Sequence, residues 1–169
     1  QYRGAAPINW AIINGDKETG VTTFFLKHEI DTGDVIFRDV VAIDENDNAG
    51  TLHDKLMLQG GDTVVRTVEA IVNGEVAAVA QTAMYACESE LRPAPKIFRD
   101  TCRIDWTKSV SQVYDFVRGM SPYPAAWFEL AAPDGKAVAI KVYEVAKEFS
   151  NHNYECGTML TDGKSYIKV

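Results

Sequence analysis

The stretch that decides the fold is Tyr2–Asp34, which reads YRGAAPINWAIINGDKETGVTTFFLKHEIDTGD. Pro7 suits the first turn of a helix. Backbone amides in that turn have no acceptor within the helix, so a proline loses no hydrogen bond there, and its φ angle is already helical. Apolar residues follow it, and Gly15 is a stop signal, so we expect a short helix that ends before Gly15. Val21–Leu26 is β-branched and aromatic, which predicts a strand.

Two more strands are predicted further along the first half of the chain. Val35–Ile43 is again rich in β-branched residues, and the polar segment Lys27–Asp34 connects it to the preceding strand as a loop. Val76–Met84 is small and apolar, which is compatible with a further strand.

A long helix is predicted between these strands. Thr51 and Asp54 have the spacing of a capping box, and apolar residues recur at three- and four-residue steps over Leu52–Val72. We expect this helix to be amphipathic and to be disturbed at the glycine pair 60–61.

Two prolines separated by one residue predict a linker at 90–96, because each fixes its backbone angle and removes an amide donor. The charge balance changes at the same place. Residues 1–95 carry 7 Lys and Arg against 15 Asp and Glu, whereas residues 96–169 carry 10 against 9. We therefore divide the chain into a domain at 1–89, the linker, and a second domain at 97–169.

The second domain is predicted to begin with a helix and to continue as strands. Ser109 and Gln112 form a capping box ahead of apolar residues that share one helical face. The predicted strands are Ala126–Ala131, Ala137–Val145, a segment at Met159 and Tyr166–Val169, with a turn at 133–135 and another at Asp162-Gly163. This pattern predicts a small antiparallel sheet or barrel.

Composition limits the class of protein. Hydrophobic residues are 46% and charged residues 24% of the chain, as in folded globular domains. We find neither a membrane-spanning apolar run nor a signal peptide, and we expect a cytoplasmic protein. The three cysteines form no Cys-x-x-Cys pair, so neither a disulfide framework nor a zinc site is predicted. The net charge of −7 argues against a nucleic-acid partner, although the second domain is much less acidic.

Asp31 is the most prominent candidate for chemistry, because a loop between two strands can host an active site. Considered alone, an Asp-Thr-Gly tripeptide is more typical of a turn in which the Asp hydrogen-bonds its own backbone. Aspartic proteases use the same tripeptide, but only one copy occurs here. His28 is interpreted as an ordinary polar residue.

Longer blocks change this interpretation. They are Tyr2–Ala11, Gly15, Thr19–Thr22 and Ile30–Gly33, followed by Arg103–Trp106 and Pro122–Trp127. Together they resemble the signature of the folate-dependent formyltransferases, and in particular of the methionyl-tRNA formyltransferase family. The resemblance covers most of the chain.

The resemblance implies an α/β fold and a specific reaction. The first domain would be the C-terminal half of a Rossmann-like formyltransferase domain, and the second an incomplete OB-like β-barrel. Such a bacterial enzyme passes a formyl group from 10-formyltetrahydrofolate to the α-amino group of methionyl initiator tRNA in translation initiation. We expect a monomer with no membrane association and no metal.

The resemblance also assigns site residues. Asp31 matches the catalytic Asp of the family, which acts with an Asn and with a His two residues later. Those two residues would precede Gln1, so the chain alone is expected to be inactive. The loop residues Glu29 and Ile30 match a family loop at the folate pocket. For tRNA, a local excess of cations around the linker supplies candidate phosphate contacts, namely Lys96, Arg99, Arg103 and Lys108.

Two alternatives remain. Enzymes of the same family that act on an amino sugar, or that are coupled to folate oxidation, share several of these blocks, although Ala5-Ala6-Pro7 and Asp31–Asp34 favour the tRNA enzyme. The chain could also be a non-catalytic module that keeps only a tRNA-binding surface.

Overall fold

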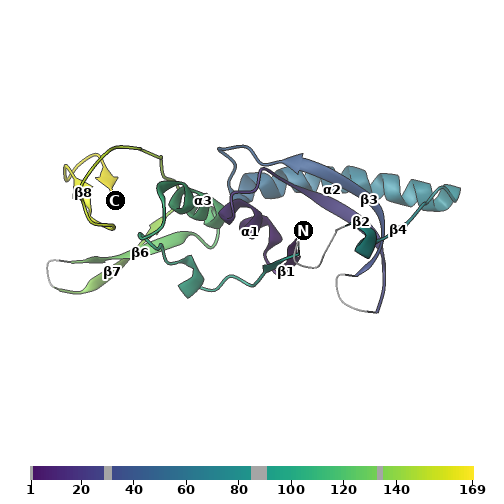
Figure 1. Cartoon of the computed structure of the whole chain (residues 1–169), viewed down its shortest axis with the longest axis horizontal. Coiled ribbons are helices and arrows are strands. Elements are labelled where there is room, and N and C mark those ends of the chain that lie inside the picture. Colours follow the sequence, from purple (N-terminus) through teal and green to yellow (C-terminus); the bar gives the residue numbers. More distant parts are fainter. Residues whose placement is uncertain (1, 29–31, 85–90, 133–134) are drawn as a thin grey trace.

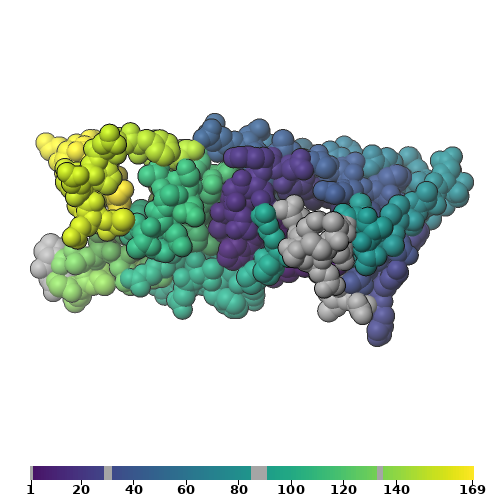
Figure 2. All heavy atoms as spheres, in the orientation of Figure 1, coloured from purple at the N-terminus to yellow at the C-terminus, as the bar shows by residue number. Residues whose placement is uncertain are grey.

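The structure, a computed structural model, describes residues 2–28, 32–84, 91–132 and 135–169. These residues form an elongated molecule (Figures 1 and 2). The elements of the first half lie toward one end and those of the second half toward the other. Helices α1 (Pro7–Ile13) and α3 (Val110–Met120) pack against each other in the middle.

An antiparallel sheet and one long helix make up most of the first half. Strand β2 (Glu18–Leu26) pairs with β3 (Gly33–Ala42), and the short β4 (Val79–Ala80) pairs with the other edge of β3. Helix α2 (Ala49–Asn73) lies along β2 and β3 (Figure 1). The predicted strands at Val21–Leu26 and Val35–Ile43 are therefore confirmed.

The third predicted strand is only partly present. Of Val76–Met84, only β4 is extended, and the rest that is regular forms the 3₁₀ helix η1 (Gln81–Met84). Val79 and Ala80 of β4 pair with Val35 and Asp34 of β3, and the strand pairing ends there.

The start and the interior of α2 differ from the prediction. The N-cap is Asn48, whose side chain accepts a hydrogen bond from the Thr51 amide, and the Thr51 hydroxyl accepts one from the Asn48 amide. Thr51 is thus the third residue of the helix, and the box predicted from Thr51 and Asp54 was wrong. Gly60 and Gly61 lie inside a continuous helix. Packing on the sheet outweighs their low helix propensity, which costs about 1 kcal/mol each.

The segment predicted as a linker contains a strand. β5 (Arg92–Ala94) pairs in parallel with β1 (Tyr2–Gly4). At Gly4 a Cβ atom would lie 2.2 Å from the carbonyl oxygen of Ala94, and φ is +139°, so only glycine fits this close approach. Part of the expected linker is therefore anchored to the beginning of the chain.

The described residues of the second half contain the 3₁₀ helix η3 (Asp100–Cys102), the helix α3 and four short strands. α3 begins at the predicted capping box of Ser109 and Gln112, which is confirmed. β6 (Ala126–Ala131) pairs with β7 (Ala137–Val142), and β8 (Leu160–Thr161) pairs with β9 (Ile167–Lys168).

These strands form two separate two-stranded sheets, and the described residues contain no closed barrel. β7 ends three residues before the predicted Val145, and residues 143–159 contain no strand that could join the two sheets. The α/β class is as predicted, whereas the OB-like barrel stays a prediction.

Two apolar cores meet at α1. Its residues Ala11 and Ile12 are fully buried in the first core, whereas Ile13 packs against the second core. The first core consists of Ala11, Ile12, Ile43, Ala49, Leu52 and Leu56, and the second of Cys102, Ile104, Val117, Met120, Ala126 and Phe128.

Among the helices of the described segments, none has the length and hydropathy of a membrane span.

The contact between α1 and α3 depends on Gly119. A Cβ atom there would lie 2.6 Å from Cγ1 of Ile13 and 3.2 Å from the carbonyl oxygen of Asn9. The Asn9 side-chain amide also donates a 2.8 Å hydrogen bond to the Gly119 carbonyl. The absence of a side chain at position 119 therefore sets the distance between the two helices.

We expect Gly119→Ala to lower the free energy of unfolding by about 1–3 kcal/mol, because the added methyl group must displace α1. Gly61→Ala is the matched control, since nothing lies within 4 Å of a Cβ there. It should raise the free energy of unfolding by roughly 0.5–1 kcal/mol. Urea unfolding of the two variants measures both effects, and equal behaviour would contradict the assigned role of Gly119.

Candidate functional site

The residues expected to bind folate and to catalyse, Glu29, Ile30 and Asp31, lie outside the described residues. The two sides of their loop are close together. The Lys27 ammonium lies 2.7 Å from Oδ1 of Asp34, and the Lys27 amide donates a 3.2 Å hydrogen bond to the Thr32 carbonyl.

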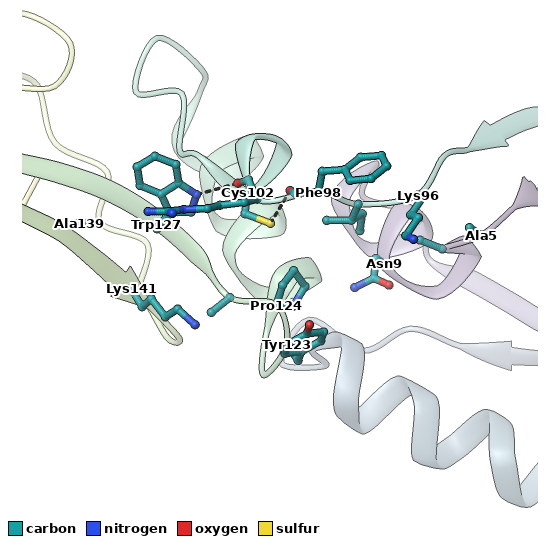
Figure 3. A pocket seen from close by; sticks show the side chains of 14 residues that line it. Ala5, Asn9, Lys96, Phe98, Cys102, Tyr123, Pro124, Trp127, Ala139 and Lys141 are labelled. Atoms are coloured by element: carbon teal, nitrogen blue, oxygen red, sulfur yellow. Dashed lines mark hydrogen bonds between the residues drawn. The ribbon is translucent and has the colours of Figure 1, made fainter.

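A cleft of about 640 Å³ lies where the two halves meet. Its walls come from α1, from the segment after β5, from the turn before β6 and from β7 (Figure 3). Three cations line it, namely Lys96, Arg99 and Lys141, and none of the described residues that line it is acidic. The cleft therefore carries positive charge in a chain whose net charge is −7.

Aromatic rings hold two of these cations in place. The Arg99 guanidinium lies 5.5 Å from the centre of the Trp127 ring, and the Trp127 indole donates a 2.8 Å hydrogen bond to the Arg99 carbonyl. The Lys96 ammonium lies 5.6 Å from the centre of the Phe98 ring. Such contacts orient a cation while leaving its donors available to an anion.

The four cations predicted to contact tRNA fall into two groups. Lys96 and Arg99 line the cleft, and within the described part of the chain neither forms an ion pair. Arg103 is paired with Glu129 at 2.9 Å, and Lys108 lies 4.0 Å from Asp105. Neither Arg103 nor Lys108 lines the cleft. Two of the four thus line the cleft, and Arg103 lies close to them, because its guanidinium is 5.6 Å from the centre of the Trp127 ring that Arg99 also contacts.

Lys141 was missed by the sequence analysis. It lies within β7, in a segment that the sequence identifies only as a strand. The β6–β7 register places it opposite Trp127, which brings it to the cleft. No local sequence signal predicts this, because the position depends on the pairing of two strands.

Cys102 also lines the cleft, but it is a structural residue. Burial raises the pKa of its thiol, which keeps the sulfur protonated and unreactive, and Sγ donates to the Phe98 carbonyl at 3.2 Å. Metal-binding clusters of three or more His, Cys, Asp or Glu residues are absent from the described segments.

Arg118 joins the two halves. Its side chain is 9% exposed, and Nη1 donates to the backbone carbonyls of Asp44 and Asp47 at 3.2 and 2.9 Å. Nε donates to Oδ1 of Asp115 at 2.8 Å. A buried guanidinium with several acceptors is strongly oriented, so the loop before α2 is fixed relative to α3.

The Asp47 carboxylate stabilises the same loop through hydrogen bonds to other residues of the first half. It accepts hydrogen bonds from the Lys55 ammonium at 2.6 Å, the Asp44 amide at 2.7 Å and the Thr51 hydroxyl at 3.0 Å. Burial raises the pKa of Asp47, but these three donors together outweigh it and hold the pKa below its usual value.

Comparisons with known proteins identify relatives of both halves. A family model described as formyl transferase matches residues 1–68, and one described as formyl transferase, C-terminal domain, matches residues 96–169. A methionyl-tRNA formyltransferase of Phocaeicola vulgatus is 59% identical over all 169 residues, which are 52% of its own length. The chain spans about half the length of the curated relatives it matches.

Solved structures share the fold. HypX from Aquifex aeolicus in complex with tetrahydrofolic acid matches 85% of this chain and 23% of its own, with a TM-score of 0.65 and 21% identity. A likely sugar N-formyltransferase from Mycobacterium tuberculosis matches 87% of this chain and 62% of its own, with a TM-score of 0.64 and 23% identity. The chain therefore has an α/β formyltransferase fold.

The contribution of Asp47 to stability should depend on pH. Because its pKa is lowered on folding, its contribution is present above the unfolded pKa of about 3.9 and is lost as the pH falls through the folded value. Asp47→Asn should lower the free energy of unfolding by roughly 1.5–3 kcal/mol at pH 7, and by progressively less below about pH 4.

Urea unfolding between pH 3 and pH 7 measures this difference. Asp62→Asn serves as the control, because Asp62 is exposed on α2. If the difference in the free energy of unfolding between wild type and Asp47→Asn stayed constant down to pH 3, the Asp47 carboxylate would not be the group responsible for the pH dependence.

Proposed function

Since the chain belongs to the formyl transferase family, we propose that it serves the transfer of a formyl group from 10-formyltetrahydrofolate to the α-amino group of methionyl initiator tRNA. The observation that carries this proposal is the 59% identity over all 169 residues with a methionyl-tRNA formyltransferase. A folate donor is further supported by the tetrahydrofolic acid bound to HypX, a protein of the same fold.

The proposed catalytic residue is Asp31. Attack of the amine on the formyl carbon forms a tetrahedral oxyanion, which an amide and an imidazole donor stabilise by roughly 2.7–4 kcal/mol per donor in known sites. The Asp31 carboxylate would hold the imidazolium, or a bound water, in the state that moves the proton from the amine to the leaving nitrogen. Glu29 and Ile30 would contact the pterin through backbone groups.

Binding of tRNA is proposed for the second half and the segment before it. Lys96 and Arg99 would contribute most, because among the described residues they line the cleft without an ion-pair partner, whereas Arg103 and Lys108 must exchange a carboxylate for a phosphate. In this proposal residues 1–89 belong to the catalytic domain, 90–96 to the linker, and 97–169 to an OB-like domain. The enzyme would act as a monomer in the cytoplasm.

A second candidate acceptor is an amino sugar, because a likely sugar N-formyltransferase shares the fold. Its 23% identity is far below the 59% of the tRNA enzyme, so the tRNA acceptor is favoured. A module that binds tRNA without catalysing transfer is the remaining alternative. Assays of the intact enzyme with charged initiator tRNA and with an amino sugar distinguish the three.

The 169-residue chain purified alone should transfer no formyl group above background, because its sequence contains no Asn-x-His motif that could act with Asp31. Formylation of charged initiator tRNA, followed with a radiolabelled formyl donor, measures this. Turnover above background would show that the chain carries a different catalytic set.

In the intact enzyme, Asp31→Ala should lower kcat/KM by about 10²–10⁴-fold, the usual contribution of a general acid–base group, and leave the melting temperature unchanged. Asp34→Ala is the matched control, since that carboxylate lies in the same segment and is paired with Lys27. It should keep most of the activity. Near-wild-type turnover of Asp31→Ala would remove Asp31 from the mechanism.

A further inference from the structure

A β-bulge interrupts the ladder between β2 and β3. Thr23 pairs with Phe37, whereas the next residue of β2 pairs with Val35, so Ile36 is left without a partner in this ladder. A bulge bends its strand and increases the local twist, so the direction of a hairpin can change there. The direction of the hairpin beyond this point therefore depends on what fixes the bulge.

The part of the hairpin beyond the bulge ends in the loop that contains Asp31. Its pairing continues without another shift to Leu26 and Gly33, the last pair before the loop. β4 pairs with β3 in this same part, opposite Asp34 and Val35. Because this short ladder is regular, a change of angle at the bulge would move both ends of the loop together.

Two threonine hydroxyls connect the bulge to helix α2, which lies along the hairpin (Figure 1). The Phe37 amide donates a 3.3 Å hydrogen bond to Oγ1 of Thr23, which in turn lies 2.9 Å from Oγ1 of Thr67. Thr67 donates its hydrogen to the Thr63 carbonyl at 2.6 Å. A hydroxyl has a single hydrogen, so Thr23 is the donor to Thr67. A continuous chain of hydrogen bonds thus runs from the bulge to the backbone of α2.

This chain of hydrogen bonds is sensitive to the loss of one hydroxyl. Thr67 is only 7% exposed, so water cannot easily replace a missing partner. A valine in place of either threonine keeps the branched shape of the side chain, but it leaves a polar group of the other threonine without its partner. The bulge would then be held to α2 by apolar packing alone at this point, which does not fix its angle as a directional hydrogen bond does.

We propose that Thr23 and Thr67 are positioning residues for formyl transfer, because the hydrogen bond between them fixes the angle of the hairpin at the bulge and with it the place of the Asp31 carboxylate. This inference rests on the proposed function, in which Asp31 is the catalytic residue. Neither threonine touches a substrate. A catalytic group that is misplaced by about 1 Å can lower the rate roughly 10²-fold, so a hydrogen bond far from the reacting atoms can govern turnover.

Steady-state kinetics of the intact enzyme with charged initiator tRNA test this role. Thr67→Val should lower kcat roughly 10- to 100-fold and leave the KM for tRNA unchanged, because the substitution displaces a catalytic group and removes no tRNA contact. Thr67→Ser keeps the hydroxyl and should restore most of kcat. Wild-type kcat in Thr67→Val, or a serine variant as slow as the valine variant, would overturn the proposal.

Thr63→Val is the matched control, one helical turn away on the same face of α2. Thr63 is 1% exposed and donates to Oδ2 of Asp39 at 2.5 Å, which lies on the side of the bulge away from the loop. The loss of this buried hydroxyl should lower the melting temperature about as much as Thr67→Val does, but it should leave kcat unchanged. An equal loss of kcat in both variants would show that stability alone is responsible.

Hydrogen exchange in the 169-residue chain measures the effect on the hairpin without catalysis. Thr23→Val and Thr67→Val should speed exchange of the amides at 33–37 relative to those at 38–42, whereas Thr63→Val should not. The absence of this difference would overturn the proposal. If the intact wild-type enzyme transfers no formyl group to tRNA, the proposed function fails, and the exchange experiment still decides whether the two threonines fix the bulge.

Discussion

The close contact of α1 with α3 is the constraint on which the rest of the structure depends. α1 has only seven residues, yet it contributes to both apolar cores. A helix of this length is not stable by itself in water, so its existence depends on packing. Gly119 allows the backbones of the two helices to approach. Arg118 fixes the loop before α2 through hydrogen bonds to the carbonyls of Asp44 and Asp47. The two halves therefore form one continuous body, and the cleft between them has walls of defined shape.

Local chemistry made much of this fold predictable. Pro7 and Gly15 define α1, and Ser109 with Gln112 defines the start of α3, because caps and stops act within a few residues. The prediction failed where tertiary packing decides. The glycine pair in α2 is tolerated because the helix lies on the sheet, and the cap is Asn48 rather than a residue of the expected box.

The candidate site was predictable only in part, for the same reason. Lys96 and Arg99 were found because they follow one another closely in the sequence next to the predicted linker. Lys141 is 42 positions further along than Arg99, and only the pairing of β6 with β7 brings it to the same cleft. Arg103 and Lys108 looked equivalent to the others in sequence, but each has a carboxylate partner in space.

The three cations that line the cleft, Lys96, Arg99 and Lys141, should affect how the protein adsorbs to charged surfaces. A chain with a net charge of −7 and a pI near 4.9 is expected to pass through a cation exchanger at neutral pH. Local charge, however, governs adsorption to a polyanion at distances near the Debye length of about 10 Å in 0.1 M salt. Heparin resin would retain this acidic protein through one small surface, and moderate salt would release it.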